Sequence, residues 1–105
     1  MKKRQTIRNS PVPDPHDARV GGVAVSLAGH DQGTILVIVA GLDEKYVLVA
    51  DGRRRVLAAP KKKQMRHLRI LTKLSEQETE SLSKGEANDC FLRRKLSGFD
   101  LACFT

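Results

Sequence analysis

The chain has 105 residues, 40% of them hydrophobic, and a formal net charge of +7 with an isoelectric point near 9.9. This length allows one domain with appendages, and no apolar run approaches the roughly 18 residues that a membrane span requires. The charge favours nucleic acid or another anionic partner over a basic one.

The N-terminal stretch is basic, contains three prolines and has almost no large apolar side chains. Alternating prolines favour extended chain and cannot donate sheet hydrogen bonds. The first four residues resemble the start of a signal peptide, but the apolar stretch that export requires does not follow. We therefore predict a disordered basic arm over residues 1–18 and a cytoplasmic protein.

Between residues 20 and 72, short β-strand patterns alternate with glycine turns, which is typical of a small β-barrel. Asp51-Gly52 is a hairpin signal because both positions tolerate the positive φ of a type I′ turn. The Gly21-Gly22 pair favours a bulge or a sharp bend in the first strand. The predicted strands are residues 20–27, 34–40, 45–50 and 53–58, with a fifth within 67–72.

The C-terminal segment has the signals of two helices. Ser75-Glu76-Gln77-Glu78 fits a capping box that begins the first helix, and Gly85 is placed to end it. Asn88 is placed to cap a second helix that runs to Ser97. The second and third predicted strands are apolar on both faces, and we expect this helical segment to cover their outer faces.

One face of the second predicted helix is apolar. Phe91, Leu92 and Leu96 share this face at helical spacing, while Arg93 and Arg94 lie away from it. The apolar face either packs on the barrel or forms a dimer or partner surface, and the sequence favours packing.

The loop Gly29-His30-Asp31-Gln32-Gly33 has a glycine at each end, which permits a tight reversal and the close approach of a phosphate. His30 and Gln32 can donate hydrogen bonds to phosphates or base edges. Asp31 cannot donate while it is ionised, so we expect it to order the loop by accepting from backbone amides. Taken alone, this pattern also fits an ordinary hairpin turn.

A cluster of cations follows the strands. Nine of the 19 Lys and Arg residues fall between Arg53 and Lys73, and no Asp or Glu interrupts them. The three arginines after the predicted hairpin are expected on a rigid strand, and the three lysines after Pro60 on a loop, both suited to phosphate oxygens. A solvated charge run is the alternative. The expected contacts are Arg53, Arg54, Arg55, Lys61, Lys62, Lys63, Arg66, His67 and Arg69.

Residues 22–37 resemble the KOW motif, which occurs in ribosomal proteins and in some transcription elongation factors. The likeness continues through residues 46–56 and 60–68. Over residues 20–72 the chain is similar to the small bacterial KOW-domain RNA-binding proteins, relatives of large-subunit ribosomal proteins built on an SH3-like barrel. The chain departs from the usual pattern at Ala58-Ala59 and at Gln32, a position where Lys or Arg is common.

The resemblance implies an SH3-like (KOW) β-barrel, here residues 19–74, that binds RNA or the ribosome and catalyses nothing. The C-terminal helical extension then covers residues 75–105. We expect ribosomal RNA or the ribosome as the partner, with no cofactor, metal or small-molecule substrate. By position, Gly33 is the KOW glycine. The loop residues expected to contact RNA are Gly29, His30, Gln32 and Gly33.

Other functions have less support in the sequence. The three histidines are scattered, and there is no P-loop, metal-ligand spacing or GxSxG motif, so we do not expect an enzyme. Cys90 and Cys103 are expected to be reduced and partly buried thiols. With Tyr46 as the only aromatic residue of the predicted barrel, we expect readout of RNA shape and phosphate rather than of sequence. The alternatives are a module that docks on an acidic protein of the transcription or translation machinery, and nonspecific DNA binding.

Overall fold

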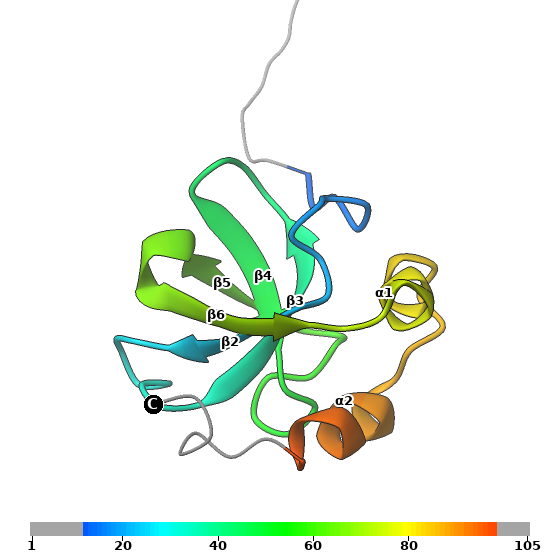
Figure 1. Ribbon diagram of the computed structural model, residues 1–105. Coiled ribbons are helices and arrows are strands. Elements are labelled where there is room, and N and C mark those ends of the chain that lie inside the picture. Colours follow the sequence, from blue (N-terminus) through cyan, green and yellow to red (C-terminus); the bar gives the residue numbers. More distant parts are fainter. Residues whose placement is uncertain (1–11, 99–105) are drawn as a thin grey trace, which may run out of the picture.

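The computed structural model describes residues 12–98, which form a five-stranded antiparallel sheet and two short α-helices (Figure 1). The strands lie in the order β5-β4-β3-β2-β6. Their bounds are Gly22–Ser26 for β2, Ile35–Gly41 for β3, Tyr46–Ala50 for β4, Lys61–Gln64 for β5 and Leu68–Lys73 for β6. Only the 3₁₀ helix η1, Met65–His67, joins β5 to β6, although these strands lie at opposite ends of the order. The sheet must therefore curl until its two ends approach each other.

The side chains of strand β3 alternate between the two sides of the curled sheet. Both sides are buried, each in a different apolar cluster. Leu36 and Ile38 belong to a buried cluster inside the curl, together with apolar residues of β2, β4 and β6. Val37 belongs to a second cluster, which includes Leu82 and Leu92 from the two helices. The prediction that the C-terminal segment covers the outer face of this strand is confirmed.

The two helices begin and end where the capping signals predict. In α1 (Glu76–Ser83), the Ser75 hydroxyl accepts from the Glu78 amide at 3.2 Å and the Glu78 carboxylate accepts from the Ser75 amide at 3.1 Å. The chain leaves this helix through Gly85, whose φ is 76°. In α2 (Asp89–Leu96), the Asn88 side chain accepts from the Phe91 amide at 2.8 Å. Both helices contact β3; in Figure 1, α1 lies to the right of the sheet and α2 at its lower right.

The apolar face of α2 packs on the sheet, as the sequence favours. Leu92 is fully buried, and Phe91 and Leu96 are half-buried against the same cluster. Arg94 is exposed and lies away from this face, as expected. Arg93 differs from this expectation, because its Nη1 donates to the carbonyl of Gly52 at 2.7 Å. This bond links α2 to the loop that follows β4.

The predicted strand over residues 53–58 is wrong, and so is the loop placement of Lys61, Lys62 and Lys63. The segment after β4 forms turns and bends, and the fourth strand of the sheet in chain order is β5, which contains the three lysines. The reason is the side chain of Asp51, whose Oδ1 accepts from the amides of Arg53 at 2.8 Å and Arg55 at 3.0 Å. These bonds replace the two-residue hairpin by a wider loop, so the return strand starts later.

The prediction of a disordered arm is wrong for residues 14–18, which the structure describes. Asp14 and Gly41 exchange two backbone hydrogen bonds, of 2.8 and 2.9 Å, which attach residues 14–18 to the end of β3. Residues 1–11 lie outside the described residues, as do residues 99–105, including Cys103. The Gly21-Gly22 pair lies at the start of β2, and the irregularity in pairing falls just after it, between Val23 and Ala24.

Candidate functional site

The loop between β2 and β3 contains a buried carboxylate surrounded by cations. Asp31 is only 4% exposed. Its Oδ2 accepts a hydrogen bond from Lys61 Nζ and lies 4.0 Å from Lys63 Nζ. Its Oδ1 lies 3.7 Å from Arg55 Nε. Asp31 therefore joins three segments of the chain: its own loop, the loop of residues 51–60, and β5.

The charges of this cluster and its burial shift the pKa values of both Asp31 and Lys63. Burial alone raises the pKa of Asp31, but the hydrogen bond from Lys61 and the positive charges of Lys61, Arg55 and Lys63 outweigh it, so the pKa lies below its usual value. Burial and the neighbouring Lys61 lower the pKa of Lys63, against the opposing effect of Asp31. The run of cations has no acid within it in the sequence, but in space it is partly neutralised by Asp31.

The loop of residues 27–34 reverses tightly, as predicted. Gly29 and Gly33 have φ of 82° and 86°, a conformation that costs other residues free energy. The Gly33 amide donates to Ser26 O at 2.8 Å, which closes the loop at its base. His30 and Gln32 are exposed at its surface. The expected role of Asp31 is wrong: its side chain binds cations from elsewhere in the chain, and the amide of Thr34 is bound by its backbone carbonyl.

The lysines of β5 point alternately to the two sides of the sheet, as strand geometry requires. Lys61 and Lys63 reach Asp31, and the Lys63 ammonium also donates to Ala28 O at 2.8 Å. Lys63 is only 7% exposed, so we assign it to the scaffold rather than to a binding surface. Lys62 lies on the other side, exposed, with its Nζ 4.4 Å from the centroid of the Tyr46 ring.

The loop of residues 51–60 is held from three directions. Asp51 binds the backbone amides of its own loop, Arg55 faces Asp31, and α2 supplies two further bonds. These are the bond from Arg93 to the Gly52 carbonyl and a bond of 2.8 Å from the Leu57 amide to Asp89 Oδ1. Nothing in the sequence pattern near the loop predicts these contacts with a helix that lies more than thirty residues away. Arg53 and Arg54 are exposed on this fixed loop.

The remaining predicted site residues follow β5. Arg66 is exposed in η1, His67 is half-buried in the same turn, and Arg69 is exposed in β6. The carbonyl of His67 accepts from the Leu27 amide at 2.8 Å, which brings η1 next to the start of the loop of residues 27–34.

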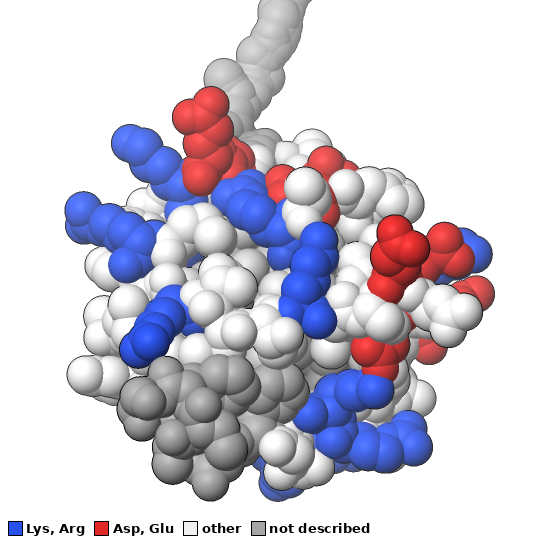
Figure 2. Space-filling view, viewed as in Figure 1, with Lys and Arg blue, Asp and Glu red and all other residues white. Residues whose placement is uncertain are grey.

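Of the cations between residues 53 and 66, four are exposed, and no Asp or Glu within residues 12–98 forms an ion pair with them. We call them the basic edge: Arg53, Arg54, Lys62 and Arg66. Figure 2 shows one face of the molecule, with acidic side chains over α1 and at the top, and basic side chains on the left, near η1, and over α2.

Residues 12–98 contain no cluster of three or more His, Cys, Asp or Glu side chains arranged for a metal ion. None of the helices in that range has the length and hydropathy of a membrane-spanning segment. Cys90 is exposed, in contrast to the partly buried thiol that the sequence led us to expect.

Two comparisons with known proteins identified no relative of this chain. No protein-family model matches the sequence, and a search of curated proteins gave no match. The resemblance to KOW-domain proteins therefore stays a prediction from the residues themselves.

Proposed function

We propose that this protein binds structured RNA through phosphate contacts from the basic edge and from the loop of residues 27–34, in association with the ribosome or the translation machinery. We further propose that its curled sheet is an SH3-like barrel of the KOW class. The sequence resemblance supports both proposals. The short connection between β5 and β6, which makes the two ends of the sheet approach each other, also supports the second.

The observation that carries the RNA proposal is the cluster around Asp31. By joining the loop of residues 27–34, β5 and the loop of residues 51–60, this carboxylate braces the segments that carry His30, Lys62 and the two exposed arginines, Arg53 and Arg54. Cations on a fixed backbone lose less conformational entropy when they bind phosphates than cations on a mobile tail do. The cluster thus gives a scaffold function to Lys61 and Lys63 and leaves their neighbours for the ligand.

Lysines on an edge strand have another use, because they prevent unwanted pairing with the edges of other sheets. Charge reversal separates the two roles. A glutamate at position 62 still discourages edge pairing, but it repels a phosphate. Loss of RNA binding without aggregation in Lys62→Glu would therefore favour the role in binding.

The decisive experiment measures binding to a structured ribosomal RNA fragment by fluorescence anisotropy at several salt concentrations. If the basic edge contacts about four phosphates, the slope of log affinity against log salt should be on the order of −3 to −4. The double variant Arg53→Glu/Arg54→Glu should bind at least tenfold more weakly. Its matched control is Lys84→Glu/Arg94→Glu, which changes the net charge equally but alters the exposed C-cap residue of α1 and an exposed residue of α2; it should change the affinity much less.

Equal losses in the two double variants would mean that only the overall charge matters, and would contradict a defined interface. Duplex DNA of the same length should bind more weakly than the RNA. The rival function, docking on an acidic protein, predicts that binding to a ribosomal fraction survives nuclease treatment, whereas the RNA proposal predicts its loss.

A further inference from the structure

A groove of about 460 Å³ lies beside Tyr46, where the turn between β3 and β4 meets the end of β5 and η1. This volume is within the range of sites that hold small organic ligands. Its lining residues are Glu44, Lys45, Tyr46, Gln64, Met65 and Arg66. The groove lies at the end of β5 that is farther from the Asp31 cluster, next to two members of the basic edge.

The Tyr46 ring is fixed in this groove. Tyr46 and Gln64 are direct partners in the β4–β5 pairing, and Gln64 Nε2 donates to the Tyr46 hydroxyl at 2.8 Å. Lys62 Nζ lies 4.4 Å from the ring centroid, and Lys62 is not one of the residues that line the groove. A held aromatic ring is a platform on which a planar ligand stacks at low entropic cost.

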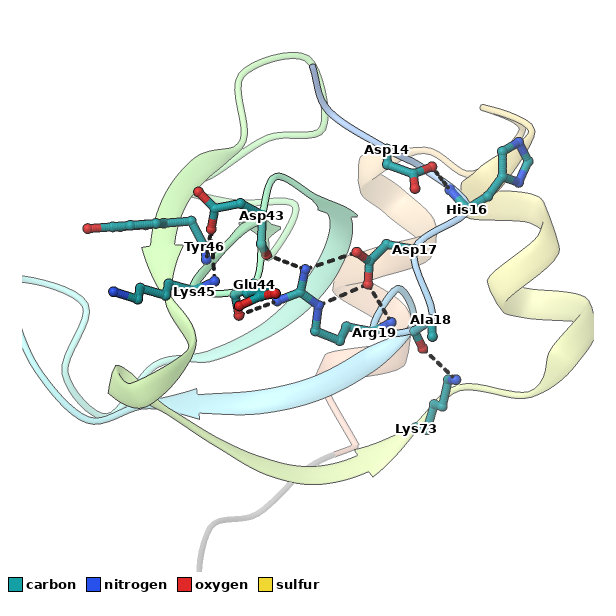
Figure 3. Close-up of polar contacts among 10 residues, drawn as sticks. All are labelled: Asp14, His16, Asp17, Ala18, Arg19, Asp43, Glu44, Lys45, Tyr46 and Lys73. Atoms are coloured by element: carbon teal, nitrogen blue, oxygen red, sulfur yellow. Dashed lines mark hydrogen bonds and ion pairs between the residues drawn. The ribbon is translucent and has the colours of Figure 1, made fainter. Parts of the chain in front are cut away.

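The turn that carries one wall of the groove is also braced. Figure 3 shows Arg19 between Asp17 and the turn, with Nη2 donating to Asp43 O at 2.6 Å and Nη1 to Glu44 O at 3.2 Å. Asp43 Oδ1 in turn accepts from the amides of Lys45 and Tyr46, each at 2.8 Å. The Lys45 and Tyr46 side chains extend to the same side of the turn, away from Arg19 (Figure 3).

The two cations of the groove come from different segments that are tied together. Lys45 and Arg66 are both exposed, and neither forms an ion pair with a carboxylate within residues 12–98. The Met65 amide donates to Lys45 O at 2.7 Å, which holds η1 against the turn. Two positive side chains therefore line the groove together with the aromatic ring of Tyr46.

We propose that this groove binds one unpaired nucleotide of an RNA, with the base stacked on Tyr46 and its phosphates beside Lys45 and Arg66. This inference rests on the proposed RNA-binding function and adds an aromatic contact to it. The Glu44 side chain in the lining opposes a bare phosphate but can accept from the N–H groups of a base edge. A ring, two cations and one hydrogen-bond acceptor together match a nucleotide better than an inorganic anion. Stacking on one ring tolerates every base, so the groove selects unpaired RNA rather than a sequence.

Tyr46 reports on its own site, because the full chain contains one Tyr and no Trp. Tyrosine emission of the intact protein is followed during titration with an unpaired oligoribonucleotide and with a fully paired RNA of equal length. We expect the unpaired RNA to quench the emission and the paired RNA to bind with little quenching. AMP should quench at lower concentration than ribose 5-phosphate, which has no base.

Variants test the energetic role of the ring. Tyr46→Leu should bind the unpaired oligonucleotide about tenfold more weakly, the order of loss expected for one stacked base. Tyr46→Phe, the matched control, keeps the ring and should bind within about threefold of the parent protein. Because the quenching experiment uses the unaltered chain, the inference can be tested even if Tyr46→Leu does not fold.

The outcomes separate this inference from the proposed function. Unpaired RNA that binds by anisotropy without quenching Tyr46 would overturn the nucleotide site and leave phosphate binding by the basic edge intact. Equal quenching by ribose 5-phosphate and AMP would also overturn it, because stacking would then play no part. Failure of every RNA to bind at low salt would overturn both proposals.

Discussion

The carboxylate of Asp31 accepts a hydrogen bond from the ammonium group of Lys61, thirty residues further along the chain. The contact crosses from the loop after β2 to the first residue of the edge strand β5. It turns one lysine of a basic run into part of the scaffold and leaves the next one, Lys62, exposed. The number of cations in such a sequence run is therefore an upper limit on the number that the surface presents to a ligand.

Removing the Asp31 charge should destabilise the protein. In Asp31→Asn, Lys63 remains buried without its counter-ion, and Lys61 and Arg55 repel it. Since Lys61 and Arg55 are partly exposed, we expect a loss of about 2 kcal/mol, below the usual range for a fully buried pair. The free energy of unfolding in urea, followed by far-UV circular dichroism, measures this loss.

The control for this variant is Glu86→Gln, which removes one negative charge from an exposed residue. It should change the stability by less than about 0.5 kcal/mol. If the two variants were equally stable, the cluster would be only a surface ion network, and the scaffold function assigned to Lys61 and Lys63 would have to be abandoned.

The elements that the sequence predicts well depend on local signals or on a strong apolar pattern. The capping box at Ser75 and the cap at Asn88 are read from side chains within four residues of the bonds they make. The apolar residues on both faces of β3 require two covers, and the apolar face of the second predicted helix can provide one of them. The caps are contacts between residues that are close in the sequence, and the cover of β3 follows from its strongly apolar pattern.

The elements that the sequence does not predict depend on contacts with residues far away along the chain. Lys61-Lys62-Lys63-Gln64 has no apolar alternation and low strand propensity, yet it forms β5 because β4 supplies the ladder and Asp31 receives the inward lysines. The loop of residues 51–60 is shaped by Asp51 and by two bonds from α2. The one available signal was Asp31 itself, an acidic residue in the predicted binding loop of a basic protein.

The buried side chain of α2 should be essential for stability. Leu92 is fully buried between the helix and the sheet, so Leu92→Ala should cost about 3 kcal/mol in the free energy of unfolding. Leu27→Ala is the matched control, because Leu27 is 48% exposed, and it should cost less than about 1 kcal/mol. If Leu92→Ala were as mild as the control, α2 would be an appendage rather than part of the core. Amide hydrogen exchange at Leu57, which donates to Asp89, should also accelerate in Leu92→Ala.

A methyl group at Gly41 should disrupt the attachment of the N-terminal segment. A Cβ there would lie 2.7 Å from Asp17 Cβ and closer still to the Asp17 carboxyl group. Gly41→Ala should therefore cost about 2 kcal/mol in unfolding free energy. Gly98→Ala, where no heavy atom of the described residues lies within 4 Å of the new carbon, should cost little. In a double-mutant cycle, Asp17→Ala should relieve part of the cost of Gly41→Ala; strict additivity would show that the clash is absent.

The same attachment should make the stability depend on pH. Arg19 donates from Nε and Nη2 to the two Asp17 oxygens, each at 2.9 Å, and these bonds lower the pKa of Asp17 from 3.8 to about 2. Because the folded pKa is the lower one, the unfolded chain takes up the proton first as the pH falls. The contribution of Asp17 is therefore complete above about pH 4 and is lost as the pH falls from about 4 to 2; at neutral pH it amounts to about 2 kcal/mol.

Other carboxylates also titrate in this range, so the quantity to measure is the difference in unfolding free energy between the parent protein and Asp17→Asn. This difference should be largest at pH 6 and should shrink towards zero near pH 2. Arg19→Gln should abolish the same pH-dependent difference, because Asp17 then has no partner that favours its charged form. A difference that stayed constant between pH 6 and pH 2 would mean that Asp17 acts through its shape and not through its charge, and the bracing of the Asp43 turn would then depend on Arg19 alone.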